Sequence, residues 1–371
     1  MRVVIAAART GGHINPGLAI AAKIKEKQPK SEILFIGTES GLEQDLVPRA
    51  GYLLKTIEAY GFNRKITIQN MVHTIKTFLS IGTAKKILKE FKPDIVIGTG
   101  GYICMPVILA AKQLKLKTML HESNAFPGAS VRMLAKKVDK VLLGFEDAKD
   151  RLPNAKTVVT GTPTKIKKLY FSQKQKEEKL QELGLDPKLP IVLAFGGSQG
   201  AKTINEALCG VIQERYNQNY QIIWACGPKQ YDSIKEEWEK KHVDIQHPKN
   251  AKIVPYIYNM EEVMNLCDIV VARSGAMTIT EVATVGKPAI FIPLPFATEN
   301  HQEYNANVLV KAKAAKMILD KDLTKDTLSD TIGEILSSKQ NQVMMGENAR
   351  KIYMPATAEK IYQEILETLE K

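Results

Sequence analysis

One histidine lies inside a glycine-rich turn near the start of the chain, in the stretch Thr10–His13 (TGGH). An unperturbed histidine titrates near pH 6.5, so it can accept a proton from a sugar hydroxyl at neutral pH. The turn runs into Asn15 and Pro16, which predicts a helix capped by Asn15 with Pro16 at its first position. Because the free N–H groups of a helix N-terminus favour an anion, a phosphate would fit beside His13. A plain tight turn, and a histidine that only bonds backbone, remain open alternatives.

Two further glycine clusters follow apolar runs, at Gly98–Tyr102 (GTGGY) and Gly196–Gly200 (GGSQG). The turns lack the G-x-G-x-x-G spacing and the chain has no Gly-Lys-Ser/Thr triplet, so neither a dinucleotide fingerprint nor a P-loop is supported. Backbone N–H groups in such loops can nonetheless hold phosphates. Three clusters in two halves of the chain predict two phosphate-bearing ligands, or one long ligand, in an interdomain cleft. Ser198 either caps the following helix or bonds a phosphate.

A carboxylate, Glu281, lies in the helical pattern that follows Ser274. It can accept hydrogen bonds from both vicinal hydroxyls of a ribose, although a solvated helical glutamate fits the spacing equally well. Ser274 is expected to cap this helix. The polar loop at residues 295–303 is expected to border the same pocket.

Metal-ligating patterns are scarce. The D-x-D sequence at Asp320–Asp322 lies in a charged connection where Asp322 or Thr324 fits a helix cap better than a metal ligand. We therefore expect no metal and no cofactor. The partial positive charge at helix N-termini would then stabilise a diphosphate leaving group.

Short runs rich in valine and isoleucine alternate with helical patterns along the whole chain, which predicts parallel sheets with right-handed crossovers. Two such series predict two doubly wound domains, with ligands at the carboxyl ends of the strands. We place the boundary near residues 160–164 and expect a helix at Ala356–Lys371 that could return to either domain. The expected strands are Val3–Ala7, Ile33–Ile36, Ile95–Ile97, Thr118–Leu120, Val141–Leu143, Ile191–Phe195, Gln221–Ala225, Ile253–Pro255, Ile269–Ala272 and Ala289–Ile292.

The composition is that of a soluble globular protein. Of 371 residues, 44% are hydrophobic and 25% charged, which supplies enough apolar material for two cores and excludes a disordered chain. The four cysteines are far apart and form no C-x-x-C pair, which argues against a disulfide framework and a structural zinc site. The N-terminal apolar run is too short for a secretion signal. These features predict a reducing, cytoplasmic setting.

The net charge of +12 is concentrated in the N-terminal half. Residues 1–162 contain 25 lysines and arginines against 13 acidic residues, whereas the remainder is balanced. Aromatic residues are only 6% and no nucleic-acid signature is present, so nucleic acid is disfavoured and anionic phospholipid is the better expectation. The segment Ile66–Phe91 carries apolar residues at helical spacing beside lysines, as a membrane-lying helix would. A helix packed on its own sheet is the alternative.

Six motifs in the same order resemble those of the MurG family, the bacterial N-acetylglucosaminyltransferases of peptidoglycan synthesis. They are TGGHINPGLA at Thr10–Ala19, GTGGY at Gly98–Tyr102, HESN at His121–Asn124, GGSQG at Gly196–Gly200, RSGAMT at Arg273–Thr278 and NHQ at Asn300–Gln302. The resemblance implies a GT-B fold, an α/β architecture of two Rossmann-like parallel-sheet domains facing across a cleft. It implies an acceptor- and membrane-binding domain at residues 1–162, joined by the final helix at 354–371, and a UDP-GlcNAc-binding domain at 163–353.

The resemblance also implies the reaction. GlcNAc would pass from UDP-GlcNAc to the 4-hydroxyl of MurNAc in lipid I, undecaprenyl-diphosphoryl-MurNAc-pentapeptide, with inversion and without a metal, giving lipid II and UDP. The enzyme would lie peripherally on the cytoplasmic face of the cell membrane, with cell-wall and division proteins as further partners. A GT-B transferase of another lipid, such as diacylglycerol, is the nearest alternative. A nicotinamide-dependent oxidoreductase and a basic binding module are disfavoured by the motifs.

Site residues carry over position by position. His13 would be the catalytic base, Glu281 would contact the ribose and Ile257 the uracil. The other implied contacts are Thr10, Gly11 and Gly12 with donor and acceptor; Asn124 and Gln302 with GlcNAc; Ser198 with the donor diphosphate; Ala276, Met277 and Thr278 with phosphates or nucleoside; Gly100, Gly101 and Tyr102 with the acceptor diphosphate; and Ile75, Phe78 and Ile81 with the membrane.

The sequence departs from the family pattern at several positions. Glycines usually stand where Ala8 and Arg9 occur, Ser123 replaces a glutamine, and Lys165 replaces an arginine. Arg9 raises the question of how open the first glycine loop is. Lys165 offers a point charge where the family has a bidentate guanidinium, so we do not assign it to the site.

Overall fold

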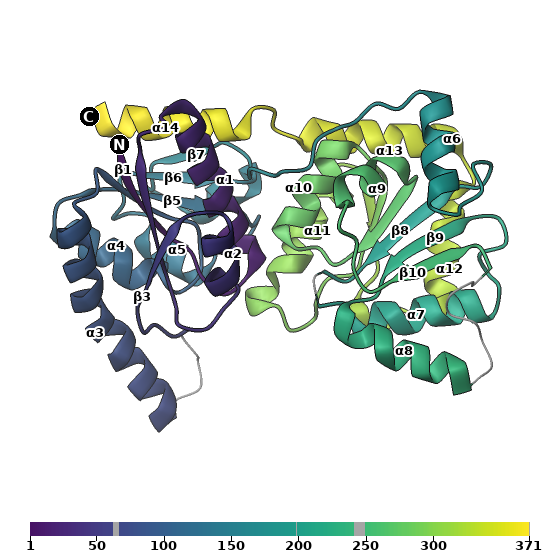
Figure 1. Cartoon of the computed structure of the whole chain (residues 1–371), viewed down its shortest axis with the longest axis horizontal. Coiled ribbons are helices and arrows are strands. Elements are labelled where there is room, and N and C mark those ends of the chain that lie inside the picture. Colours follow the sequence, from purple (N-terminus) through teal and green to yellow (C-terminus); the bar gives the residue numbers. More distant parts are fainter. Residues whose placement is uncertain (62–66, 198, 241–248, 371) are drawn as a thin grey trace. The chain divides into compact units, whose positions relative to one another are not determined.

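A computed structural model describes residues 1–61, 67–197, 199–240 and 249–370. The chain forms two compact units (Figure 1). Met1–Thr164 and Met354–Lys371 form the first unit, and Lys165–Tyr353 form the second. We expected the change of domain after residue 162, and the units divide between Thr164 and Lys165.

The first unit is built on a seven-stranded parallel sheet in the order β3-β2-β1-β4-β5-β6-β7. The residues of β1 after its first are fully buried, as expected for a parallel sheet covered on both faces. The strands are β1 (Arg2–Ala6), β2 (Glu32–Gly37), β3 (Leu53–Thr56), β4 (Ile95–Gly98), β5 (Lys117–Glu122), β6 (Lys140–Leu143) and β7 (Thr157–Val159).

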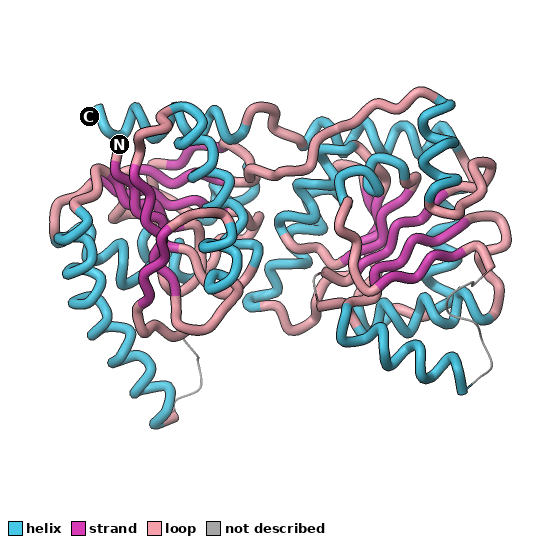
Figure 2. Tube along the Cα trace, viewed as in Figure 1, coloured by secondary structure: helices cyan, strands magenta, loops and turns pink. Residues whose placement is uncertain are grey.

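Helices cover both faces of this sheet (Figure 2). One hydrophobic cluster joins the strands to α3, α4 and α5, and another joins them to α1, α2 and α14. The helices of the unit are α1 (Gly11–Lys27), α2 (Glu43–Arg49), α3 (Ile68–Phe91), α4 (Cys104–Gln113), α5 (Ala129–Leu134), the 3-10 helix η1 (Glu146–Arg151) and α14 (Thr357–Glu370).

The last helix, α14, docks on the first unit through a buried apolar face. Ile361 and Ile365 lie in the same hydrophobic cluster as α1. Polar contacts flank that face: Gln28 donates a hydrogen bond to the Tyr362 hydroxyl at 3.0 Å, and Lys140 forms an ion pair with Glu364. The C-terminal segment therefore completes the fold of the N-terminal unit, although 189 residues of the second unit separate the two in sequence.

The second unit is built on a six-stranded parallel sheet in the order β10-β9-β8-β11-β12-β13. One face of it packs on α7, α8 and α12, while α10 contacts α9, α11 and α13. The strands are β8 (Ile191–Phe195), β9 (Gln221–Ala225), β10 (Ala251–Val254), β11 (Ile269–Ala272), β12 (Ala289–Phe291) and β13 (Ala315–Met317). The helices are α6 (Gln173–Glu182), α7 (Lys202–Gln213), α8 (Pro228–Lys240), α9 (Met260–Leu266), α10 (Ala276–Val285), η2 (Thr298–Asn300), α11 (His301–Lys311), η3 (Asp320–Asp322), α12 (Lys325–Leu336) and α13 (Lys339–Ile352).

These two units confirm the predicted pair of parallel-sheet α/β domains. Three predicted helix caps have different outcomes. Asn15 is not a cap, because α1 begins a turn earlier at Gly11 and contains Pro16. Ser274 is not a cap either: Gly275 precedes α10, and the buried Ser274 hydroxyl has no partner among the described residues. Thr324 does cap α12, by accepting a hydrogen bond from the Thr327 N–H.

Candidate functional site

The loops that follow β1 and β4 meet at the point where the strand order of the first sheet reverses. β1 and β4 are neighbours, with β2 and β3 on one side and β5 to β7 on the other. In open parallel sheets, ligands bind at the carboxyl ends of strands at such a switch point. The buried Thr99 hydroxyl ties the two loops together by donating to the His13 carbonyl at 2.7 Å.

The His13 ring lies within hydrogen-bond distance of one backbone carbonyl and one side-chain hydroxyl. Its Nδ1 lies 3.2 Å from the Ala8 carbonyl oxygen and 3.3 Å from the Thr10 hydroxyl. A carbonyl oxygen can only accept, so the hydrogen bond to Ala8 requires the proton on Nδ1 and leaves the basic lone pair on Nε2. This is the tautomer that a general base acting through Nε2 needs.

Gly100 and Gly101 have to be glycines for this ring to lie where it does. Their φ angles are 108° and 80°, a region that side chains disfavour. A Cβ at Gly100 would lie 2.6 Å from His13 Cδ2, and one at Gly101 would lie 3.1 Å from His13 Nδ1. The second glycine cluster therefore forms a backbone surface against which the histidine packs.

The start of α1 offers two N–H donors beside this histidine. In the part of the chain that the structure describes, the N–H groups of Gly11 and Gly12 have no hydrogen-bond partner. No acidic residue lies in the first turn, and Thr10 does not cap the helix with its side chain. Donors at the positive end of a helix dipole favour an anion. Thr10, Gly11, Gly12 and His13 thus lie at one loop pair with Gly100, Gly101 and Tyr102.

Glu43 supports this loop, although no sequence motif marks it. Its side chain is fully buried, with Oε2 accepting from the Arg9 N–H at 2.8 Å. Oε1 accepts from the Thr38 N–H at 3.0 Å and from the Thr38 hydroxyl at 2.6 Å. Burial would raise the pKa of Glu43, but these hydrogen bonds hold it below its ordinary value. A charged carboxylate thereby anchors the turn from 34 residues away.

The HESN motif has separate structural and site-facing parts. Glu122 accepts hydrogen bonds from the Asn124 backbone N–H at 2.8 Å and from its side-chain Nδ2 at 2.9 Å, which fixes the orientation of the Asn124 amide at the end of β5. His121 is fully buried and lies 3.1 Å from the Gly161 carbonyl oxygen. Burial lowers the pKa of His121 to about 4. His121 is therefore neutral at physiological pH and holds the chain where it leaves the first unit.

The predicted donor residues follow the carboxyl ends of strands in the second unit. Ala276, Met277 and Thr278 form the first turn of α10, which follows β11 and has neither a side-chain cap nor an acidic first turn. Glu281 lies on the same helix and is partly exposed. Ser198 lies outside the described residues.

Two further predicted residues follow strands of the second sheet: Ile257 lies in the loop after β10, and Gln302 lies in the first turn of α11. The Gln302 side chain is oriented by its Oε1, which accepts from the Leu294 N–H at 3.0 Å. Ile257 follows β10 and is buried, between Tyr256 and Tyr258, whose rings lie 5.1 Å apart. Ile257 lies after β10, whereas Gln302 lies beyond β12.

Arg273 makes structural contacts at this edge of the second sheet. Its guanidinium donates to the carbonyl oxygens of Ile292 and Pro293, at 3.1 and 3.2 Å, and forms an ion pair with Asp320. Asp320 also accepts from the Thr203 hydroxyl at 2.7 Å. The first aspartate of the D-x-D sequence is thus engaged in holding three segments together. Within the described ranges, no group of three or more histidine, cysteine, aspartate or glutamate side chains is arranged to hold a metal ion.

Comparison with known proteins identifies both halves of the chain. Residues 3–143 match the glycosyltransferase family 28 N-terminal domain, and residues 191–364 match the glycosyltransferase family 28 C-terminal domain. The solved structure of MurG from Acinetobacter baumannii aligns with a TM-score of 0.75 at 28% identity, covering 99% of each chain. The fold is therefore the GT-B fold of that enzyme.

Two curated relatives have nearly the same length as this chain. A protein of Acetivibrio thermocellus is 41% identical over 365 residues, which is 98% of this chain and 97% of the relative. One of Bacillus cytotoxicus is 40% identical over 371 residues, covering all of both chains. Both are named UDP-N-acetylglucosamine--N-acetylmuramyl-(pentapeptide) pyrophosphoryl-undecaprenol N-acetylglucosamine transferase. This chain belongs to that family, the MurG family of glycosyltransferases.

Proposed function

We propose that this enzyme transfers GlcNAc from UDP-GlcNAc to the 4-hydroxyl of MurNAc in lipid I, giving lipid II and UDP with inversion at the anomeric carbon. The main structural support is the His13 ring, which the Ala8 carbonyl orients beside two glycine loops. The chain is also about 41% identical to a transferase named for this reaction. The names of these relatives do not favour the diacylglycerol alternative.

In this proposal His13 Nε2 takes the proton of the acceptor hydroxyl as its oxygen attacks the anomeric carbon. Inversion needs one displacement, in which the C–O bond to UDP breaks as the new glycosidic bond forms. The acceptor diphosphate lies against Gly11 and Gly12 and the loop at Gly100–Tyr102, where backbone N–H donors favour an anion.

The second unit supplies the donor site in this proposal. Glu281 accepts from the ribose hydroxyls, the backbone at Ile257 contacts the uracil, and Asn124 of the first unit and Gln302 contact GlcNAc. Ala276, Met277 and Thr278 offer their N–H groups to the donor phosphates, with Ser198 as a further contact. The leaving UDP gains charge as the bond breaks, and the dipole of α10 would stabilise it without a metal ion.

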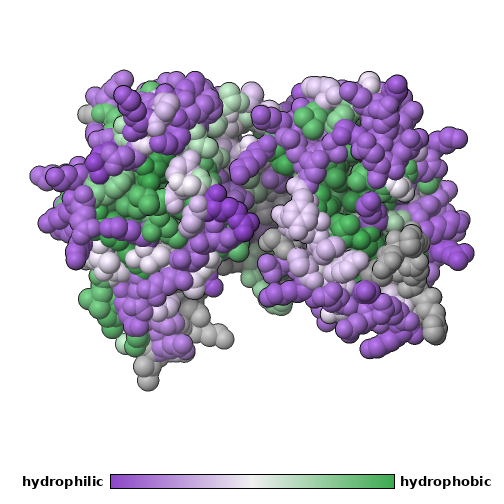
Figure 3. All heavy atoms as spheres, in the orientation of Figure 1, coloured by the Kyte–Doolittle hydropathy of each residue, from purple (hydrophilic) through white to green (hydrophobic). Residues whose placement is uncertain are grey.

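We further propose that α3 attaches the enzyme to the cytoplasmic face of the cell membrane. In the first half of this helix, apolar side chains face solvent and polar ones are buried, the reverse of an ordinary surface helix. The exposed residues are Met71, Val72, Ile75, Phe78 and Leu79, and the buried ones include Thr77 and Ser80. Hydrophobic residues gather over this part of the first unit (Figure 3). An exposed apolar surface of this kind is typical of an interaction site. Ile81 instead packs on the core, so Leu79 takes its place in the proposal.

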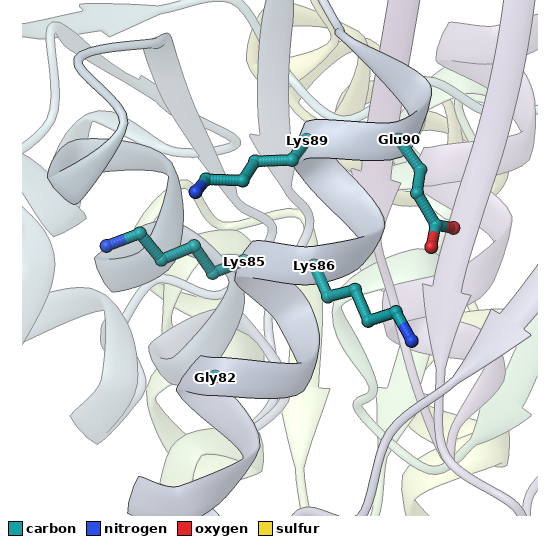
Figure 4. A pocket seen from close by; sticks show the side chains of 5 residues that line it. All are labelled: Gly82, Lys85, Lys86, Lys89 and Glu90. Carbon is teal, nitrogen blue, oxygen red and sulfur yellow. The ribbon is translucent and has the colours of Figure 1, made fainter.

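Lysines follow directly on the same helix. Lys85, Lys86 and Lys89 line an open hollow of about 440 Å³ together with Gly82 and Glu90, and their ammonium groups extend away from the helix (Figure 4). Basic side chains beside inserted apolar ones add electrostatic attraction to an anionic phospholipid surface. No helix of the described chain is long and apolar enough to span a membrane. Cell-wall and division proteins are proposed as partners on the family resemblance alone. Nucleic acid is not proposed as a partner.

The direct test of the reaction is transfer of labelled GlcNAc with purified enzyme, shortened-chain lipid I and a chelator. We expect a disaccharide-linked lipid and one UDP per transfer. Activity should persist with the chelator, because the proposed mechanism uses backbone N–H donors and side chains to bind the phosphates and move the proton. Diacylglycerol offered in parallel should give no product. Glycosylation of diacylglycerol but not lipid I would contradict the proposal, and turnover restored only by added Mg²⁺ would contradict its metal-independent part.

His13→Gln tests the base. Glutamine can keep a hydrogen bond to the Ala8 carbonyl but cannot accept a proton, so we expect kcat to fall by about 10² to 10⁴. UDP-GlcNAc binding, measured by calorimetry, should stay near the wild-type value, since the donor contacts are elsewhere. Turnover within a few-fold of wild type would remove His13 from the role of base.

Vesicle co-sedimentation tests the membrane surface. Changing Ile75, Phe78 and Leu79 to serine together should strongly weaken binding to vesicles that contain anionic phospholipid, because it removes most of the exposed apolar area of α3. The matched control changes the exposed Leu53 and Met133 of the same unit to serine. If both variants lost vesicle binding equally, or if the α3 variant lost none, the apolar face of α3 would not be the membrane-binding surface.

A further inference from the structure

Arg9 stands in an unusual backbone conformation at the first glycine loop. Its φ angle is 72°, in the left-handed region, and its side chain is exposed. This conformation is unfavourable for a residue with a Cβ but not for glycine. Arg9 nonetheless occupies this position, directly before Thr10 and the start of α1.

The surrounding chain fixes this conformation from both sides. The buried Glu43 carboxylate accepts the Arg9 backbone N–H at 2.8 Å. Glu43 does not form an ion pair with the Arg9 guanidinium, and no other carboxylate of the described residues does so. The Glu43 carboxylate instead accepts hydrogen bonds from the Arg9 backbone N–H and from Thr38. The guanidinium charge of Arg9 is therefore not compensated by a carboxylate of the described residues.

The guanidinium is directed toward the second glycine loop. Its central carbon lies 5.8 Å from the centre of the Tyr102 ring, within the range of a cation–π contact. Tyr102 follows Gly100 and Gly101, whose backbone packs against the His13 ring. One positive side chain is thus held at the loop pair that also carries the Gly11 and Gly12 N–H donors.

We propose that Arg9 binds the diphosphate of the lipid-linked acceptor and so adds a charged, bidentate contact to a site otherwise made of backbone N–H groups. A planar guanidinium matches two phosphate oxygens at once, and the Tyr102 ring pre-orients it. This inference rests on the proposed function, since it assigns a specificity-determining residue to the same acceptor site. It predicts that Arg9 acts on acceptor binding rather than on the donor.

Arg9→Gly is the informative variant, because glycine suits a φ of 72° and should not destabilise the loop. We expect the KM for shortened-chain lipid I to rise about ten- to hundredfold, with the KM for UDP-GlcNAc and kcat within about twofold of wild type. Arg9→Lys should recover part of the loss, as it keeps the charge without the fork. Raising the salt concentration should increase the acceptor KM more steeply for wild type than for Arg9→Gly.

Arg215→Gly is the matched control. Arg215 is also exposed and also left-handed, with a φ of 60°, but it follows α7 in the second unit, so its kinetic constants should not change. An unchanged acceptor KM in Arg9→Gly, or a rise in the KM for UDP-GlcNAc alone, would overturn the inference while leaving the reaction intact. Absence of lipid II formation by the wild-type enzyme would instead overturn the proposed function. Circular dichroism checks that Arg9→Gly is folded. Arg9→Gln, which keeps an aliphatic side-chain stem without the charge, should raise the acceptor KM in the same way.

Discussion

The contact between the His13 ring and the backbone around it is the constraint on which the catalytic loop depends. The Ala8 carbonyl fixes the proton on Nδ1, and the two left-handed glycines after β4 make room for the ring. Because β1 and β4 are hydrogen-bonded neighbours, the two loops are carried by one rigid sheet. Small changes in either loop would move the basic nitrogen, and catalysis is sensitive to displacements of that size.

Buried acidic side chains hold these loops in place through hydrogen bonds. Glu43 fixes the turn before α1, and Glu122 fixes the amide of Asn124. In the second unit, the Arg273–Asp320 pair ties the ends of neighbouring segments together in the same way. The carboxylates of Glu43 and Glu122 are buried and hydrogen-bonded, whereas Arg273 and Asp320 are partly buried; in each case, removing one partner would leave the other unpaired.

The central strands were predictable because a strand buried on both faces reads as a continuous apolar run. Three of the predicted strands, those of β8, β9 and β11, match the structure at both ends. The strands that sequence analysis did not find are β3, β7 and β13, which lie at sheet edges and have no continuous buried run.

The candidate site was predictable where glycines and motifs mark it, and not where it depends on tertiary contacts. Asn15 and Pro16 resemble a helix start, but α1 begins earlier, at Gly11, and contains Pro16, which has no N–H to donate to the Gly12 carbonyl. Glu43 carries no motif, and its partner Arg9 is far away in sequence. The reversed polarity of α3 emerges only when its buried and exposed faces are known, because Thr77 and Ser80 are ordinary helix residues in sequence.

The most direct test of the role of His13 is the protonation state of its ring, measured by nitrogen NMR on enzyme labelled at histidine, with the His13 signals assigned by their loss in His13→Gln. At a pH well above the ordinary histidine pKa, we expect a proton on Nδ1 and an unprotonated Nε2. A proton on Nε2 at that pH would contradict this role, because the hydrogen bond to the Ala8 carbonyl would then be absent and the nitrogen proposed as the base would have no lone pair to use.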